Sequence, residues 1–159
     1  MRYSGQDDRG FTMIEIVVVL LVISIIGAAV TISSVYSTSD YNLVSQTEVI
    51  KGHLRYAQAR AMNTDVVWGI EFSDSKTYSL FKNGNTGDKV VLPAETSDSV
   101  TLPDGMTITV ATVSFDSWGN PYTDAPATLP AANDINIIVT YNGSESETIV
   151  ITKNTGFIP

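Results

Sequence analysis

The amino-acid sequence predicts an α+β fold, in which a long N-terminal helix packs on an antiparallel β-sheet domain. Residues 11–32 form a nearly continuous apolar run, and residues 33–64 continue with helical periodicity. After Asn63 the pattern changes to short alternating runs that are separated by turn residues. We therefore expect a polar leader at 1–10, an apolar helix at 11–32, an amphipathic helix at 33–64 and a β-rich domain at 65–159.

The composition limits the classes of function. The chain of 159 residues carries 17 acidic and 9 basic side chains, whereas a nucleic-acid partner requires a basic surface. It has no cysteine, which excludes disulfides, thiolate nucleophiles and Cys-ligated metals. The single histidine, His53, has no nucleophile or acid pattern around it. We expect neither an enzyme nor a cofactor, and we expect a structural role for His53.

Glu15 is the one strongly polar residue in the apolar run at 11–32. A helix of this length extends about 33 Å, which is enough to cross the roughly 30 Å hydrocarbon core of a bilayer. Helix is favoured there because the backbone must satisfy its own hydrogen bonds in lipid. Arg2 and Arg9 in the leader favour a cytoplasmic N-terminus, so the rest of the chain is expected outside.

Three interpretations of this segment are open from the residues alone. A secretory signal peptide could be cleaved near Gly27-Ala28-Ala29, and a plain signal anchor would keep the segment in place. A third interpretation gives specific roles to Gly10, Phe11 and Glu15. Glu15 could also simply complement the helix macrodipole from the first turn.

The stretch Arg9-Gly10-Phe11-Thr12-Met13-Ile14-Glu15, with its aliphatic continuation, resembles the class III signal of type IV pilins and type II secretion pseudopilins. The resemblance implies that a prepilin peptidase cuts after Gly10 and methylates the new N-terminal residue, Phe11. It also implies a single-pass protein of the bacterial inner membrane with a periplasmic C-terminal domain, which assembles with other pilins or pseudopilins into a filament. One departure is that residues 28–32 lack the proline of many members.

Cleavage after Gly10 would give Phe11 a free α-amino group, which is largely cationic at neutral pH because its ordinary pKa is about 7.7–8.0. Glu15 of one subunit can then pair with this amine on a neighbour. Each ion is unfavourable alone in hydrocarbon, and pairing offsets that penalty. We expect the pair to favour docking and to set the axial register of the subunits.

The continuing helix carries an apolar stripe at steps of seven, four, three and four, formed by Leu43, Ile50, Leu54, Ala57 and Ala61. We expect this stripe to pack on the sheet, with His53, Arg55 and Arg60 on or beside the solvated face. The stretch at 33–40 has weaker helical character and allows a bend or a new helix start at Ser39 or Asp40.

Turn signals divide the remaining chain into strands and loops. The expected hairpins are 66–72 with 77–81, and 135–141 with 148–152 across Asn142-Gly143-Ser144. A loop is expected at 83–88. Further short strands are expected at 90–92, 106–110 and 113–115.

The resemblance extends into this half. Residues 57–63 followed by Val66, the stretch 102–105 and the final 155–158 resemble GspH/FimT-type minor pseudopilins and pilins. Residues 115–122 are instead similar to a segment of major pseudopilins, in which a nearby loop binds calcium. Asp116, Asp124 and Asp134 lack the dense spacing of a calcium loop, so we interpret them as turn residues and expect no metal.

The sequence thus predicts a pilin-like fold and a minor pseudopilin or minor type IV pilin that helps to initiate or cap a filament. The alternatives are a secreted or membrane-anchored binding domain with an ordinary signal sequence, or a major pseudopilin. Trp68, Trp118 and Tyr122 are candidates either for a partner surface or for the core. The residues do not separate a secretion system from a pilus system.

Overall fold

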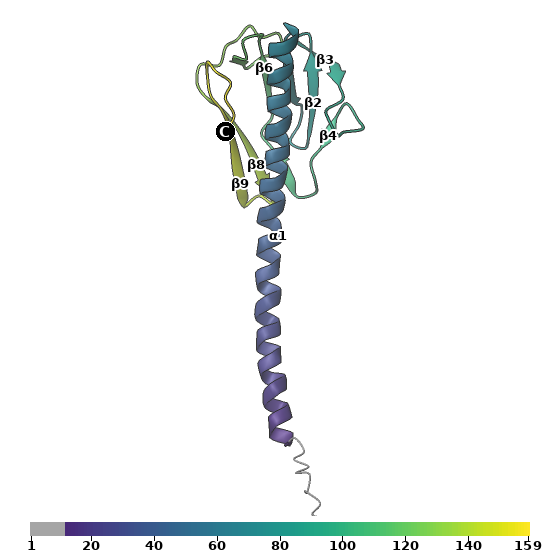
Figure 1. Cartoon of the computed structure of the whole chain (residues 1–159), viewed down its shortest axis with the longest axis vertical. Helices are drawn as coiled ribbons and strands as arrows, with labels where there is room; N and C mark the ends of the chain where they lie inside the picture. The colour runs from purple at the N-terminus through teal and green to yellow at the C-terminus, as the bar shows by residue number, and fades with distance from the viewer. Residues whose placement is uncertain (1–11) are drawn as a thin grey trace, which may run out of the picture. The chain divides into compact units, whose positions relative to one another are not determined.

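The structure, a computed structural model, describes residues 12–159, with side chains described for residues 12–26 and 42–159. The chain divides into two units, Met1–Thr38 and Ser39–Pro159. One helix, α1 (Met13–Thr64), belongs to both (Figure 1). The helix continues without a break through residues 33–40, where the sequence also allowed a bend or a new helix start. The predicted leader, 1–10, lies outside the described residues.

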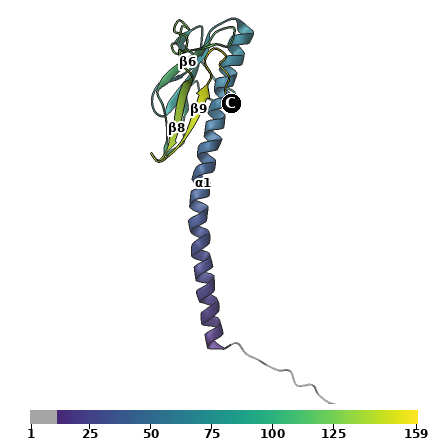
Figure 2. The ribbon, with the colours of Figure 1, turned by 90° about the vertical axis from the view of Figure 1, so that its left-hand side faces the viewer.

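The unit Ser39–Pro159 contains two antiparallel sheets beside the C-terminal part of α1 (Figure 2). In the larger sheet the strand order is β3-β2-β1-β6-β7. The short strand β4 pairs with Thr77 and Tyr78 at the start of β2. In the smaller sheet the order is β5-β8-β9. The strands are β1 (Trp68–Phe72), β2 (Thr77–Lys82), β3 (Asn85–Val90), β4 (Val100–Thr101), β5 (Met106–Ile108), β6 (Ala111–Phe115), β7 (Pro121–Tyr122), β8 (Ile135–Tyr141) and β9 (Glu145–Ile151). The predicted combination of an N-terminal helix with antiparallel sheets is confirmed.

One hydrophobic core joins the helix to both sheets. The predicted stripe of α1 is buried along its whole length, from Leu43 to Ala61. It shares a cluster with Ile70 and Leu80 of the larger sheet and with Ile137 of the smaller one. Burial of such aliphatic side chains stabilises the fold by about 1.5–3 kcal/mol each. The helix therefore holds the two sheets together.

The expectation that His53 lies on or beside the solvated face is wrong. Its side chain is only 8% exposed, and its Nδ1 lies 3.0 Å from the hydroxyl oxygen of Tyr78. A buried polar ring is tolerated because it is hydrogen-bonded. Arg55 is exposed and Arg60 is half-buried, as expected for residues beside the solvated face.

The expected loop at 83–88 is also wrong, because β3 begins at Asn85. Asn83 and Gly84 alone make the turn, with φ angles of 58° and 65°, and Lys82 pairs with Asn85 across it. Two positive φ angles in an Asn-Gly turn are typical of a type I′ hairpin. Since β3 continues to Val90, no separate strand forms at 90–92.

The β1 strand contains a close approach that only glycine permits. Gly69 pairs with Phe81 on one side and Ser114 on the other. A Cβ atom at this position would lie 2.4 Å from Cζ of Phe81 and 2.4 Å from the carbonyl oxygen of Val113. The absent side chain thus leaves room for the Phe81 ring, which is fully buried.

Candidate functional site at the start of helix α1

The first turn of α1 is capped by Thr12. The backbone N–H of Glu15 donates to Oγ1 of Thr12 at 3.3 Å, and the N–H groups of Glu15 and Ile16 donate to the Thr12 carbonyl at 3.1 and 3.3 Å. Thr12 at the N-cap with Glu15 three residues later has the sequence of a capping box. The spacing Thr-x-x-Glu in the sequence is the signal from which this role of Thr12 could have been predicted, although it was not. The cap fixes Glu15 in the first turn.

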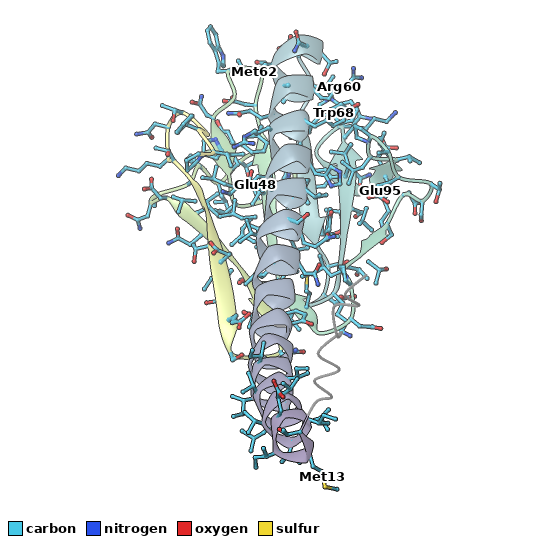
Figure 3. All side chains as sticks on the ribbon, turned by 60° about the horizontal axis from the view of Figure 1, so that its bottom comes forward. Met13, Glu48, Arg60, Met62, Trp68 and Glu95 are labelled. Atoms are coloured by element: carbon cyan, nitrogen blue, oxygen red, sulfur yellow. The ribbon has the colours of Figure 1, made fainter. Side chains whose placement is uncertain are left out.

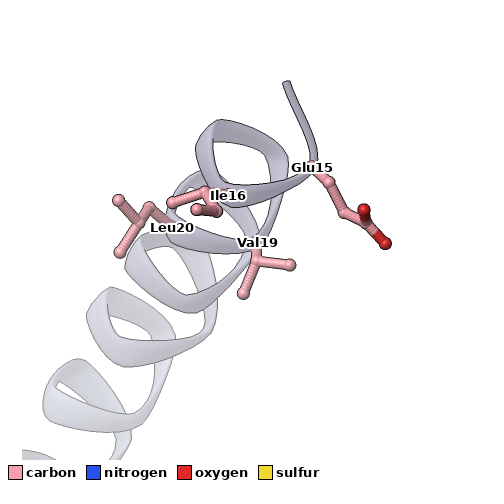
Figure 4. A pocket seen from close by; sticks show the side chains of 4 residues that line it. All are labelled: Glu15, Ile16, Val19 and Leu20. Carbon is pink, nitrogen blue, oxygen red and sulfur yellow. The ribbon is translucent and has the colours of Figure 1, made fainter. Parts of the chain in front are cut away.

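Glu15 is exposed, and its carboxylate points away from the helix axis (Figure 4). A shallow hollow on the helix surface lies between Glu15 and the side chains of Ile16, Val19 and Leu20. Among the residues that the structure describes, no basic group forms a salt bridge with Glu15. The arrangement presents one carboxylate at the edge of an apolar surface, where a cation from elsewhere can reach it.

The helix after Glu15 is apolar on every side. The large aliphatic side chains between Met13 and Ile26 are 46% to 87% exposed. The hydroxyl of Ser24, a mild polar group in this stretch, donates to the carbonyl oxygen of Leu20 at 2.7 Å. A helix that is hydrophobic all round is normally covered by lipid or by other helices.

Within the part of the chain that the structure describes, no helix has both the length and the apolar character needed to cross a membrane.

Gly10 and Phe11, the other two predicted site residues, lie outside the described residues. Of the predicted set, the structure therefore places only Glu15.

Of the three aspartates considered for calcium, Asp116 and Asp124 bind within their own loops, whereas Asp134 binds the backbone that follows β9. Oδ1 of Asp116 accepts from the N–H groups of Trp118 and Asn120, and Oδ2 accepts from the Asn120 amide and the Tyr122 hydroxyl. Asp124 accepts from residues 128 and 129, and Asp134 accepts from the N–H of Lys153. Over residues 12–159, wherever side chains are described, no group of three or more acidic or histidine side chains is placed to hold a metal ion.

Comparison with known proteins found a sequence motif near the N-terminus and solved structures with a similar fold. Residues 6–31 match the prokaryotic N-terminal methylation motif. The fold is similar to the type IV minor pilin FimU of Pseudomonas aeruginosa strain PAO1, with a TM-score of 0.55 and 18% identity over 77% of this chain and 90% of that one. It is also similar to the minor pseudopilin EpsH from the type II secretion system of Vibrio cholerae, with a TM-score of 0.53 and 10% identity over 77% and 94%. A second EpsH structure gives 0.52 and 10% over 74% and 94%.

No curated protein matches the chain at a significant level. The motif and the fold nevertheless agree with each other. They confirm the resemblance to type IV pilins and pseudopilins at the N-terminus and in the folded domain.

Proposed function

We propose that this chain, which carries a prepilin-type methylation motif and the fold of minor pilins, is a minor pilin or minor pseudopilin. In this role it is a structural subunit of a periplasmic filament that is anchored in the bacterial inner membrane. The observation that carries the proposal is the start of α1. There a capped first turn presents Glu15 at the edge of a helix that is apolar on every side.

Processing comes first in the proposed sequence of events. A prepilin peptidase recognises the leader, cuts after Gly10 on the cytoplasmic side and methylates the amino group of Phe11. Because Thr12 caps the helix, the bond that is cut precedes the first helical residue, Met13. The apolar residues remain in the mature chain and hold it in the membrane until assembly.

Assembly then uses the charge that cleavage creates. The amine of Phe11 on one subunit meets the Glu15 carboxylate of its neighbour, while the aliphatic side chains of the two helices pack together. In a low dielectric each isolated charge is strongly unfavourable, so a helix that lacks its partner docks poorly. The pair therefore selects the axial position at which both charges are satisfied.

The similarity to FimU and EpsH, which are both described as minor subunits, supports a role at the start or tip of the filament rather than along its shaft. The proposal includes no catalytic activity for this chain, which is a substrate of the peptidase.

The substitution Glu15→Val tests the assembly step in bacteria that produce the filament. We expect the variant to be inserted and processed normally but to be lost from sheared filaments, as measured by immunoblotting of the filament and membrane fractions. Glu15→Asp is the matched control, because it keeps the charge, and we expect it to assemble better than Glu15→Val. Normal incorporation of the Val variant would contradict the charge-pair mechanism.

A further inference from the structure

Two asparagines in the sequence are followed directly by glycine, Asn83-Gly84 and Asn142-Gly143, and each pair lies in the turn of a β-hairpin. Asparagine before glycine is prone to deamidation, because glycine has no side chain to hinder the attack of its backbone nitrogen on the asparagine side chain. The reaction requires that this nitrogen lose its proton and that the peptide rotate toward the side-chain amide. The two turns differ in both respects.

The turn at Asn83-Gly84 holds the reacting groups in place. The N–H of Gly84 donates to the carbonyl oxygen of Val67 at 3.3 Å. The side-chain amide of Asn83 donates to the Asp88 carboxylate. A Cβ atom on Gly84 would lie 3.0 Å from Cα of Pro126, in the loop that follows β7. Rotation of this peptide would therefore break a hydrogen bond and disturb a packed neighbour.

The turn at Asn142-Gly143, between β8 and β9 (Figure 2), leaves the same groups free. Both residues are exposed, and a Cβ atom on Gly143 would meet nothing within 4 Å. Among the residues that the structure describes, neither the N–H of Gly143 nor the side-chain amide of Asn142 has a hydrogen-bond partner. The peptide between them can rotate without displacing another segment.

Asn142 itself is anchored on the side away from Gly143. Its backbone N–H donates to the carbonyl oxygen of Gly105 at 2.8 Å. Its Oδ1 atom faces the same residue, since a Cβ atom on Gly105 would lie 2.6 Å from it. The carbon that is attacked is therefore held by a neighbouring loop, while the attacking peptide is open to solvent.

We propose that Asn142 is a site of spontaneous deamidation in the folded protein, whereas Asn83 is protected. The backbone nitrogen of Gly143 gives its proton to a solvent base and attacks Cγ of Asn142. The N–Cγ bond forms and the Cγ–Nδ2 bond breaks, and the leaving nitrogen takes a proton from water to become ammonia. Water then opens either carbonyl of the resulting succinimide ring, so the products are aspartate and isoaspartate.

Conversion changes the hairpin of β8 and β9 in two ways. Both products add one negative charge at position 142, three residues before Glu145, whose Oε2 atom is buried without a hydrogen-bond partner among the described residues. Isoaspartate also routes the main chain through the former side chain, which adds one backbone atom to the turn. The hydrogen bond from the N–H of Ser144 to the carbonyl oxygen of Tyr141, 3.2 Å long, spans this link and is lost in isoaspartate.

Incubation of the purified full chain in detergent micelles tests the proposal. One sample stays folded in a mildly alkaline buffer, and a second is unfolded in guanidinium chloride at the same pH. Both are digested at mildly acidic pH, where the reaction is slow. Mass spectrometry with electron-transfer fragmentation then measures aspartate and isoaspartate at positions 83 and 142.

The unfolded sample is the reference for the folded one. Both positions should convert at similar rates in guanidinium chloride, because glycine follows the asparagine in each case. In the folded chain, conversion at position 142 should be at least about fivefold faster than at position 83. That factor corresponds to about 1 kcal/mol, which is the usual net contribution of one hydrogen bond such as that of the Gly84 N–H.

Asn142→Gln is the matched variant, because glutamine would have to form a six-membered ring and reacts much more slowly. After the same incubation of the folded parent chain, the Ser144 amide should exchange its hydrogen faster in the isoaspartate fraction. In the folded Gln variant the exchange at this amide should stay as it was before incubation. Equal acceleration in the variant would show that another change loosens the turn.

The inference goes beyond the proposed function and does not depend on it, since the reaction needs neither the peptidase nor a filament. Asn142 that stays intact in the folded chain while the unfolded chain converts would overturn the inference. Equal conversion at positions 83 and 142 in the folded chain would overturn it as well. Both results would leave the proposed function standing.

Discussion

Nδ1 of His53 lies 3.0 Å from the hydroxyl oxygen of Tyr78, and this contact connects α1 with β2 inside the core. Burial lowers the pKa of His53, and the Glu95 carboxylate and the Pro93 carbonyl offset only part of this effect. Burial also raises the pKa of Tyr78. Both side chains are therefore neutral near pH 7, and the hydrogen bond joins a neutral imidazole to a neutral phenol.

The first prediction concerns the dependence of stability on pH. The unfolded chain takes up a proton on His53 at an ordinary pKa of about 6.5, whereas the folded chain takes it up only at lower pH. Stability should therefore be constant just above that pH and should fall as the pH drops below it, with a slope of at most about 1.4 kcal/mol per pH unit. Urea unfolding of the full chain in detergent micelles between pH 7.5 and 5.5 measures this slope.

His53→Gln is the control for that measurement, because glutamine accepts a hydrogen bond but does not titrate. The slope should be absent from this variant. Equal slopes in the two proteins would show that another group causes the loss of stability.

The second prediction concerns Gly69. In Gly69→Ala the added methyl group would collide with the Phe81 ring and with the backbone of Val113 and Ser114. Overpacking of this kind costs about 1–3 kcal/mol or more. The free energy of unfolding, measured in urea on the full chain, should therefore fall by at least about 1 kcal/mol.

Gly52→Ala is the matched substitution for Gly69→Ala. Gly52 lies in α1, and a Cβ atom there would meet nothing within 4 Å. This change should stabilise the protein by about 0.5–1 kcal/mol, because alanine favours the helix. Equal stability of the two alanine variants would contradict the claim that the packing around Gly69 leaves no room for a methyl group.

The third prediction concerns the cap of α1. Thr12→Val removes the hydroxyl that accepts from the N–H of Glu15, and loss of an N-cap costs about 1 kcal/mol. The Glu15 amide should then exchange its hydrogen about fivefold faster, since 1.4 kcal/mol is a factor of ten. Hydrogen exchange in micelles measures this change, and Thr12→Ser should behave like the parent chain. An unchanged rate in the Val variant would mean that the Thr12 hydroxyl does not contribute to the cap.

The sequence predicted the elements that have a strong apolar period. The stripe on α1 and the hairpin of β8 and β9 follow directly from the spacing of buried residues, although β9 begins at Glu145 rather than at 148. It missed β3 because this strand lies at a sheet edge and buries no residue fully, so its side chains are mostly polar. The short strands β4 and β7 were not predicted either, since two residues carry no period.

The burial of single residues could not be predicted for a different reason. His53 is buried because Tyr78, 25 residues away, provides its hydrogen-bond partner, and no local pattern reveals such a partner. Trp68 is buried, and the Arg60 guanidinium lies 4.9 Å from its ring centre (Figure 3). Trp118 is exposed. The sequence contained both tryptophans but could not distinguish them, because their exposure depends on how α1 and the loops pack.

The mass of the mature N-terminal peptide tests the central claim most directly. In bacteria with an active prepilin peptidase, the chain should begin at Phe11 and carry one additional methyl group, and Gly10→Ala should retain residues 1–10. Mass spectrometry of the purified protein and of this variant distinguishes these forms. A mature chain that begins near Thr31, or a parent chain that keeps its leader, would contradict the account.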